Sequence, residues 1–314
     1  MQLLFPLIAV LFWSFKVIVN KLSVGVIDPA AMSFYRWLLA LLVLTPFMLP
    51  QLRRHAGTIM LHWGKLLFLG FLGMVLYQSM AYYAAHSISA LMMGILVSLI
   101  PLFTVLISIP LLGVVHTFSL LCGSLLSFFG ISWLISGGHP TLILAQGIGR
   151  CEVMMFIAAL AYALYGVLTK RWSIALPTWV SLYVQIAFGV VLLLPNVLLA
   201  QSIVLNAQNL PLVLFAGIFA SIFAPWMWIV GVMRIWANNA SIFINLTPVF
   251  TALIAVTLLH ETLHSYHIVG GIQVLLGVVM AQHMRTPRAQ HNAVCAPDSY
   301  TSRSQIHEVE ANRK

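Results

Sequence analysis

Charged residues are scarce in this sequence, making up 7% of its 314 residues, whereas soluble proteins carry about 25%. Hydrophobic residues make up 61%, and the mean hydropathy is +1.02. A soluble fold would have too little polar surface to cover this composition, which excludes an ordinary soluble enzyme. The sequence therefore predicts a protein whose main solvent is lipid.

Cysteine and acidic residues are also few. The three cysteines, Cys122, Cys151 and Cys295, are widely separated, which argues against a disulfide framework and against a paired-cysteine metal site. Only 6 Asp and Glu stand against 15 Lys and Arg, but the basic residues occur singly or in pairs between apolar runs. Nucleic-acid binding needs a clustered basic face, so we expect no nucleic-acid partner, and no cofactor or metal.

Long apolar runs dominate the rest of the sequence. A helix needs about 20 apolar residues to cross the hydrocarbon core of a bilayer, and ten such runs are present. They cover approximately residues 3–22, 31–50, 66–86, 89–111, 117–136, 153–170, 178–200, 210–232, 238–259 and 265–284. The first run lacks the basic start and cleavage site of a signal peptide. The sequence thus predicts an all-α membrane protein with ten transmembrane helices, followed by a disordered polar tail at 285–314.

Basic residues between the runs predict the orientation. With a cytoplasmic N-terminus, only Lys21 and Arg150 fall outside. Eleven fall inside: Arg53, Arg54, Lys65, Lys170, Arg171, Arg234, Arg285, Arg288, Arg303, Arg313 and Lys314. The positive-inside rule therefore predicts a protein of the cytoplasmic (inner) membrane with both termini in the cytoplasm.

The sequence also repeats itself. A shift of 147 residues superposes the segment from Ser98 to Ile107 on the segment from Asn245 to Ile254, and twelve of the 41 positions from 90 to 130 match their counterparts. A shift of 149 aligns Lys16 with Tyr165 and Lys21 with Lys170. Each repeat, 1–137 and 138–284, holds five predicted helices. Because five is odd, the second repeat must enter the bilayer from the opposite side, which predicts inverted repeats with a substrate site near the midplane.

These features resemble the drug/metabolite transporter superfamily, specifically its ten-helix EamA-type exporters. The matches are Trp13 to Lys21, Asp28-Pro29 through Arg36 to Ala40, the two Pro-centred helices, and Glu261 followed by Gly270 and Gly277. The resemblance covers residues 3–284. It implies gradient-driven export of amino acids or other small amphipathic metabolites by alternating access, and no enzymatic activity.

One departure from the family concerns its acidic residues. The family commonly has a Glu at the end of the fourth helix of each repeat, but the counterpart of Glu261 here is Val114. Asp28, Glu152 and Glu261 fall at predicted outer ends, and the other acidic residues lie in the tail. The sequence therefore argues against a proton relay built on a central carboxylate.

Two prolines fall inside predicted spans at matching positions of the two repeats. Pro101 and Pro248 are expected to kink their helices and to free backbone carbonyls, which lipid does not tolerate unless protein or water is adjacent. Ser98 and Asn245, one turn earlier, would then offer polar contacts in a cavity. The alternative is that these prolines only shape helix packing.

Two cations also fall inside predicted spans. Lys16 is costly to bury, so we expect it to bind a substrate carboxylate opposite Tyr165, unless its ammonium reaches the outer interface. Arg36 presents the same alternatives, with Asp28 as a surface partner. The remaining candidate substrate-binding residues are polar or aromatic side chains near mid-span: Trp13, Tyr77, Gln78, Tyr82, Tyr162, Gln185 and Trp226.

A competing motif is His260-Glu261-Thr-Leu-His264, which fits the H-E-x-x-H pattern of zinc metalloproteases. An intramembrane metalloprotease is therefore one alternative function, and a membrane scaffold without transport activity is another. Glycines at 123, 130, 270, 271 and 277 would let helices approach closely. Packing within the bundle and a homodimer contact both fit this pattern.

Overall fold

The computed structural model describes residues 3–113, 118–139, 148–200, 202–235 and 243–283, and these ranges are helical apart from turns and connecting segments. The helices in chain order are α1 (Leu4–Leu22), α2 (Pro29–Arg54), α3 (Ala56–Leu61), α4 (Trp63–Gly70), η1 (Phe71–Leu76), α5 (Tyr77–Ala84), α6 (Ala90–Val97), α7 (Ile100–Leu112), α8 (Phe118–Ile135), α10 (Arg150–Trp172), α11 (Thr178–Leu198), α12 (Leu210–Leu214), η2 (Phe215–Phe223), α13 (Ala224–Ile235), α15 (Thr247–Leu258) and α16 (Ser265–His283).

Within the described ranges, eight helical segments are long and apolar enough to cross a membrane. Two shorter apolar helices, Thr247–Leu258 and Ser265–Met280, follow them. The protein is therefore a multi-pass membrane protein, as predicted. The start of the ninth predicted span, 238–259, and the whole tail at 285–314 lie outside the described residues, and the count of ten stays a prediction.

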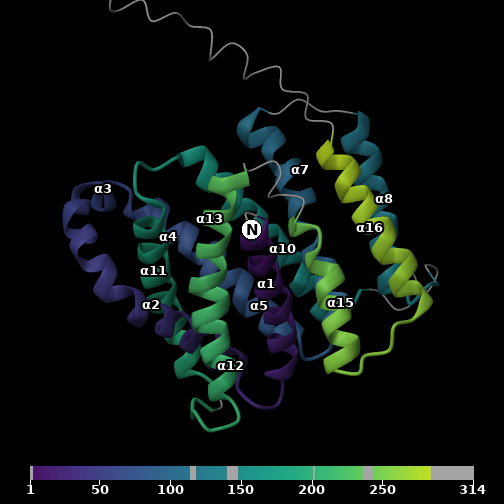
Figure 1. Ribbon diagram of the computed structural model, residues 1–314, viewed down its shortest axis with the longest axis horizontal. Helices are drawn as coiled ribbons and strands as arrows, with labels where there is room; N and C mark the ends of the chain where they lie inside the picture. The colour runs from purple at the N-terminus through teal and green to yellow at the C-terminus, as the bar shows by residue number, and fades with distance from the viewer. Residues whose placement is uncertain (1–2, 114–117, 140–147, 201, 236–242, 284–314) are drawn as a thin grey trace, which may run out of the picture.

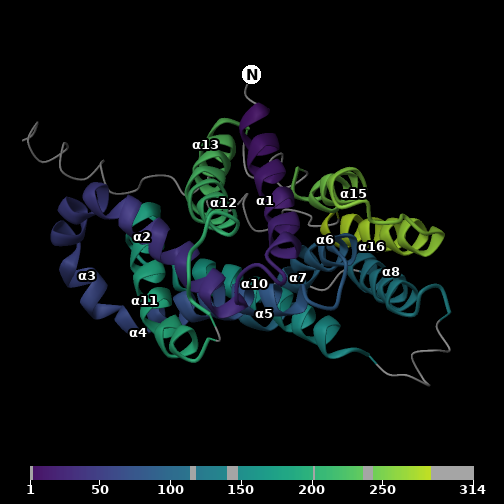
Figure 2. The ribbon, with the colours of Figure 1, turned by 90° about the horizontal axis from the view of Figure 1, so that it is seen from below.

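The helices pack in two outer pairs around a central group (Figures 1 and 2). At one edge α8 lies along α16, and at the other α2 lies along α11. Between these edges, α1 contacts both α13 and α15, and α10 contacts both α5 and α7. The two central helices, α1 and α10, thus connect elements from distant parts of the chain.

Glycines bring α8 and α16 into backbone contact. A Cβ atom added to Gly130 would lie 2.8 Å from the carbonyl oxygen of Gly270, and one added to Gly270 would lie 2.8 Å from that of Gly130. Gly277 meets the carbonyl oxygen of Gly123 in the same way. Only residues without a side chain allow this approach. These glycines therefore pack helices within one chain, and a homodimer stays a prediction.

The two prolines mark interruptions rather than kinks inside continuous helices. Residues 98–99 form a turn between α6 and α7, and residues 245–246 form a turn before α15. Pro101 and Pro248 each lie in the first turn of the helix that follows, where proline removes no intrahelical hydrogen bond. A disruption is thus present beside each proline, but its mechanism differs from the prediction because a new helix starts there.

Two π-helical segments were not expected from the sequence. The segment η1 precedes α5, and η2 precedes α13. The shift of 147 residues places 71–76 on 218–223, so both wide turns lie at corresponding points of the chain. Trp37 of α2 stabilises the first by donating its indole N–H to the carbonyl oxygen of Met74, at 2.8 Å. Such turns are rare in proteins overall, and those that do occur are frequently found at functional sites.

Candidate functional site

Lys16 of α1 lies at the centre of the bundle and is only 4% exposed. Its Nζ atom lies 5.0 Å from the ring centroid of Tyr77 and 5.8 Å from that of Tyr82. In the described part of the chain, no side-chain or backbone oxygen accepts a hydrogen bond from this ammonium. Lys16 is therefore held inside the protein by aromatic rings rather than reaching the membrane surface.

Arg36 of α2 is the second buried cation, 3% exposed. Its Nε atom donates to Ser221 Oγ at 2.7 Å, and its Nη1 atom donates to Gln78 Oε1 at 2.6 Å. The guanidinium carbon lies 4.7 Å from the Trp37 ring. All of these partners are neutral, so they fix the orientation of the guanidinium without balancing its charge.

Tyrosines extend the cluster from the first half of the chain to the second. Tyr77 of α5 lies 4.6 Å from Tyr162 of α10, and Tyr162 lies 5.5 Å from Tyr165, all between ring centroids. Gly73 of η1 makes room for the last ring, since a Cβ there would lie 3.1 Å from Tyr165. The predicted residues Lys16, Arg36, Gln78 and the four tyrosines are thus brought together.

The cluster carries two positive charges and no negative one among the described residues. Lys16 contacts Tyr77 and Arg36 contacts Gln78, so the two cations lie at neighbouring residues of α5. The described carboxylates all lie at helix ends: Asp28 caps α2, Glu152 lies in the first turn of α10, and Glu261 lies between α15 and α16. The prediction that no carboxylate lies at the centre holds for the described part of the chain.

Gln185, Ser98 and Trp13 make their observed contacts outside this cluster. Gln185 of α11 is buried and donates to Ser181 Oγ at 2.9 Å. Ser98 is buried in the α6–α7 turn and donates to the carbonyl oxygen of Ile95, and Asn245 lies in the turn before α15. Trp13 packs on the ring of Trp228, and Trp226 is 42% exposed on α13. Trp226 therefore faces the surroundings of the bundle rather than a central site.

Sequence reasoning missed two members of the cluster, Ser221 and Trp37. Ser221 lies in η2, accepts from Arg36, and donates to the carbonyl oxygen of Ala216 five residues earlier. Neither residue is charged, and neither stands out in an apolar run. The only available signal was position, because Trp37 follows Arg36 directly and Ser221 falls within a predicted span.

A clamp of opposite charges holds the turn between α5 and α6. Lys21 Nζ donates to the carbonyl oxygens of Ala85 and Ile88, at 2.8 and 2.9 Å. The carboxylate of Glu261 accepts the backbone N–H groups of Ala90 and Leu91, at 2.8 and 3.0 Å. Glu261 thus caps the N-terminus of α6, where the helix dipole favours a negative charge.

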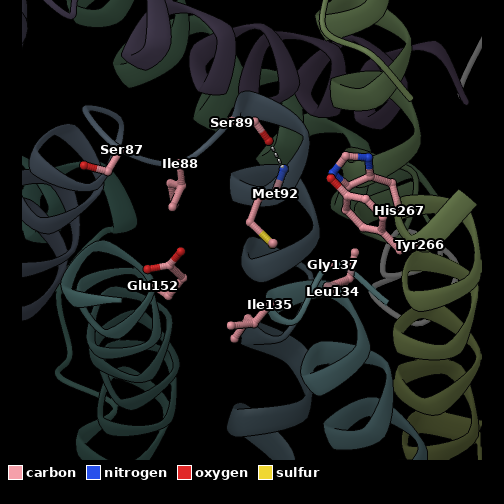
Figure 3. A pocket seen from close by; sticks show the side chains of 10 residues that line it. All are labelled: Ser87, Ile88, Ser89, Met92, Leu134, Ile135, Gly137, Glu152, Tyr266 and His267. Atoms are coloured by element: carbon pink, nitrogen blue, oxygen red, sulfur yellow. Dashed lines mark hydrogen bonds between the residues drawn. The ribbon is translucent and has the colours of Figure 1, made fainter. Parts of the chain in front are cut away.

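An open pocket of about 220 Å³ lies beside this turn. Figure 3 shows Ser89 and Met92 between Glu152 on one side and Tyr266 and His267 on the other. The α8 C-terminus completes the lining. The pocket therefore lies at the same end of the bundle as the clamp.

The H-E-x-x-H motif does not have the geometry of a zinc site. Residues 260–264 form an irregular segment between α15 and α16, and His260 has a φ of 54°. The two histidines are therefore not one helical turn apart, as zinc binding by this motif requires. Glu261 is already bound to the N-terminus of α6. The metalloprotease interpretation is wrong for this reason.

A multi-pass helical bundle with a polar, charged centre is the architecture of a membrane transporter. The chain belongs to the EamA-like transporter family, which matches residues 1–136 and 149–281. This confirms the resemblance noted from the sequence.

Individual relatives cover most of the chain. An "Uncharacterized transporter" of Archaeoglobus fulgidus is 26% identical over 87% of this chain and 94% of its own length. The "Uncharacterized transporter YyaM" of Bacillus subtilis is 24% identical over 83% and 87%. A solved crystal structure of a protein 18% identical in sequence superposes with a TM-score of 0.61, over 91% of this chain and 98% of its own. That last likeness concerns the fold alone.

Proposed function

We propose that this protein is a secondary transporter that exports a small amphipathic metabolite, such as an amino acid, from the cytoplasm across the inner membrane by alternating access. The observation that carries the proposal is the central cluster. Helices from both family-matched ranges build it, since Arg36 of α2 binds Ser221 of η2 and the ring of Tyr77 of α5 packs against that of Tyr162 of α10. When two halves of a transporter rock against each other, a site between them is exposed first to one side of the membrane and then to the other.

The proposed halves are two inverted five-helix repeats, 1–137 and 138–284, with both termini and the 285–314 tail in the cytoplasm. Two features support the inversion. The contacts Gly130 to Gly270 and Gly277 to Gly123 mean that α8 and α16 run in opposite directions. The packing also keeps its pattern when the two proposed halves are exchanged. Helix α1 of the first half contacts α13 and α15 of the second, and α10 of the second half contacts α5 and α7 of the first.

The clamped turn between α5 and α6 is the proposed outer gate. Lys21 comes from the first half and Glu261 from the second, so movement of one half away from the other breaks one set of these bonds. The buried central cluster then opens toward the pocket beside the turn. In the described conformation this end is closed.

Transport is tested with purified protein in vesicles loaded with a cytosolic metabolite extract, with released compounds identified by mass spectrometry. Replacing Pro101 or Pro248 by Ala allows a continuous helix across each interruption, and we expect release to fall while membrane insertion is kept. Pro110→Ala is the matched control, because Pro110 is exposed on α7 away from the interruption. If vesicles with the wild-type protein release metabolites no faster than loaded vesicles without protein, a non-transporting scaffold remains as the function.

A further inference from the structure

We propose that the central cluster binds a small organic dianion, with the two negative charges placed between Lys16 and Arg36. This inference rests on the proposed transport function and narrows its substrate from amphipathic metabolites in general, zwitterionic amino acids included, to dianions. It follows from the number, burial and partners of the charged groups in the cluster.

Lys16 is the first step of the argument. Moving an ammonium out of water is costly unless an opposite charge or several hydrogen bonds replace the lost solvation. The faces of Tyr77 and Tyr82 supply part of this through cation–π contacts. Within the described ranges, the Lys16 ammonium donates to no oxygen acceptor. Its N–H groups are therefore available for a ligand oxygen.

Arg36 is the second step. A guanidinium has five N–H donors, and two of them are directed to Ser221 and Gln78. The Trp37 ring covers one face of the group. The guanidinium is therefore fixed in orientation, with donors left over for a carboxylate, whose two oxygens match its fork.

The position of Tyr82 joins the two cations. Its ring contacts the Lys16 ammonium, and Gln78, one turn earlier on α5, binds the Arg36 guanidinium. Tyr82 is completely buried. A ligand that touches this side chain is therefore within reach of both cations.

The charge count then sets the class of ligand. With no carboxylate at the cluster in the described part of the chain, a neutral or zwitterionic ligand leaves two buried positive charges unbalanced. A monoanion leaves one, and a cation adds a third. While Lys16 is protonated, only a ligand with two negative charges neutralises the site, where the low dielectric makes each unbalanced charge costly.

The test measures binding to the full-length protein in detergent by isothermal titration. Three probes of nearly equal size differ only in charge: succinate, its monoamide succinamate and its diamide succinamide. We expect succinate to bind on the order of tenfold to a hundredfold more tightly than succinamate, because one charge-assisted contact is lost, and succinamide more weakly still. Glycerol 3-phosphate shows whether a phosphate monoester serves as well as a dicarboxylate. Equal affinity for the diamide and the dianion would overturn the proposal.

Variants assign the charges to residues. Lys16→Met and Arg36→Met are each expected to remove the preference for succinate over succinamate, a ratio that does not depend on how much protein is folded. Lys65→Met is the matched control, because Lys65 is an exposed lysine at the start of α4. We expect it to keep the wild-type ratio. A Lys16→Met protein that still prefers the dianion would remove Lys16 from the site.

Transport in vesicles separates this inference from the function on which it rests. Release of labelled succinate from vesicles supports both. Release of cationic or neutral metabolites without release of dianions overturns the substrate class and leaves the transporter function standing. Release of no metabolite from the cytosolic extract overturns the function itself.

Discussion

Loss of the Glu261 carboxylate should open the end of the bundle where α6 begins. Glu261 accepts two backbone N–H groups, from Ala90 and Leu91. Hydrogen bonds to a charged group stabilise by about 1.5–3 kcal/mol each, but Glu261 is half-buried and the freed N–H groups can bind water. We therefore expect Glu261→Ala to favour the open form by about 1–2 kcal/mol, the upper range for loss of an N-terminal cap.

This free energy corresponds to roughly a 5- to 30-fold increase in the open population, at 1.4 kcal/mol per factor of ten. The assay is labelling of a cysteine at Leu91, which is 2% exposed, by an impermeant maleimide in a protein lacking its native cysteines. The labelling rate should rise in proportion to the open population, and Glu261→Gln, which keeps one acceptor oxygen, should give a smaller increase.

A cysteine at Ser87 is the control. Ser87 is exposed at the rim of the same pocket, so its labelling rate should not respond to Glu261. An unchanged rate at Leu91 in Glu261→Ala would refute the idea that this cap holds the end closed. A parallel rise at both positions would indicate general unfolding instead, and would refute it equally.

Further predictions concern packing, the π-helical turn and orientation. Gly277→Leu would overlap the backbone of α8 and should destabilise the folded protein by about 1–3 kcal/mol, seen as a lower melting temperature, whereas Gly166→Leu should not, because Gly166 faces open space. Trp37→Phe removes the indole hydrogen bond to η1 and should cost about 1 kcal/mol in thermal stability; an unchanged melting temperature would contradict this. A cysteine at Gln51 should resist an impermeant reagent in intact cells and one at Gly138 should react, and the reverse pattern would overturn the orientation and the direction of export.

The helices were predictable because lipid imposes one simple pattern on the sequence. A run of about 20 apolar residues has few alternatives to a spanning helix, and the ends of α1 and α11 fall within two residues of those predicted. The short helix α3 and the two π-helical segments were not predicted. They depend on tertiary contacts, such as the bond from Trp37 to Met74, which leave no periodic signal.

The central cluster was predictable from the sequence where it contains charge. Lys16 and Arg36 stand out in apolar runs because burying them is costly, and both lie in the central cluster. Neutral residues gave no such signal, so Ser221 was missed, and Trp226 was included although its side chain is 42% exposed. The face of a helix that an aromatic residue occupies is decided by packing, which the composition of an apolar run does not record.

The glycine contacts between α8 and α16 have the form of an isologous interface. The pair Gly130 and Gly270 becomes the pair Gly277 and Gly123 when each residue is moved by 147 positions, and both pairs are in backbone contact. Such self-complementarity is the property of a twofold interface between identical subunits. In a single ancestral repeat that paired with itself, one substitution at either glycine would have altered this surface twice. Within one chain the four positions can change independently, so the two halves are free to diverge while the contact between them is kept.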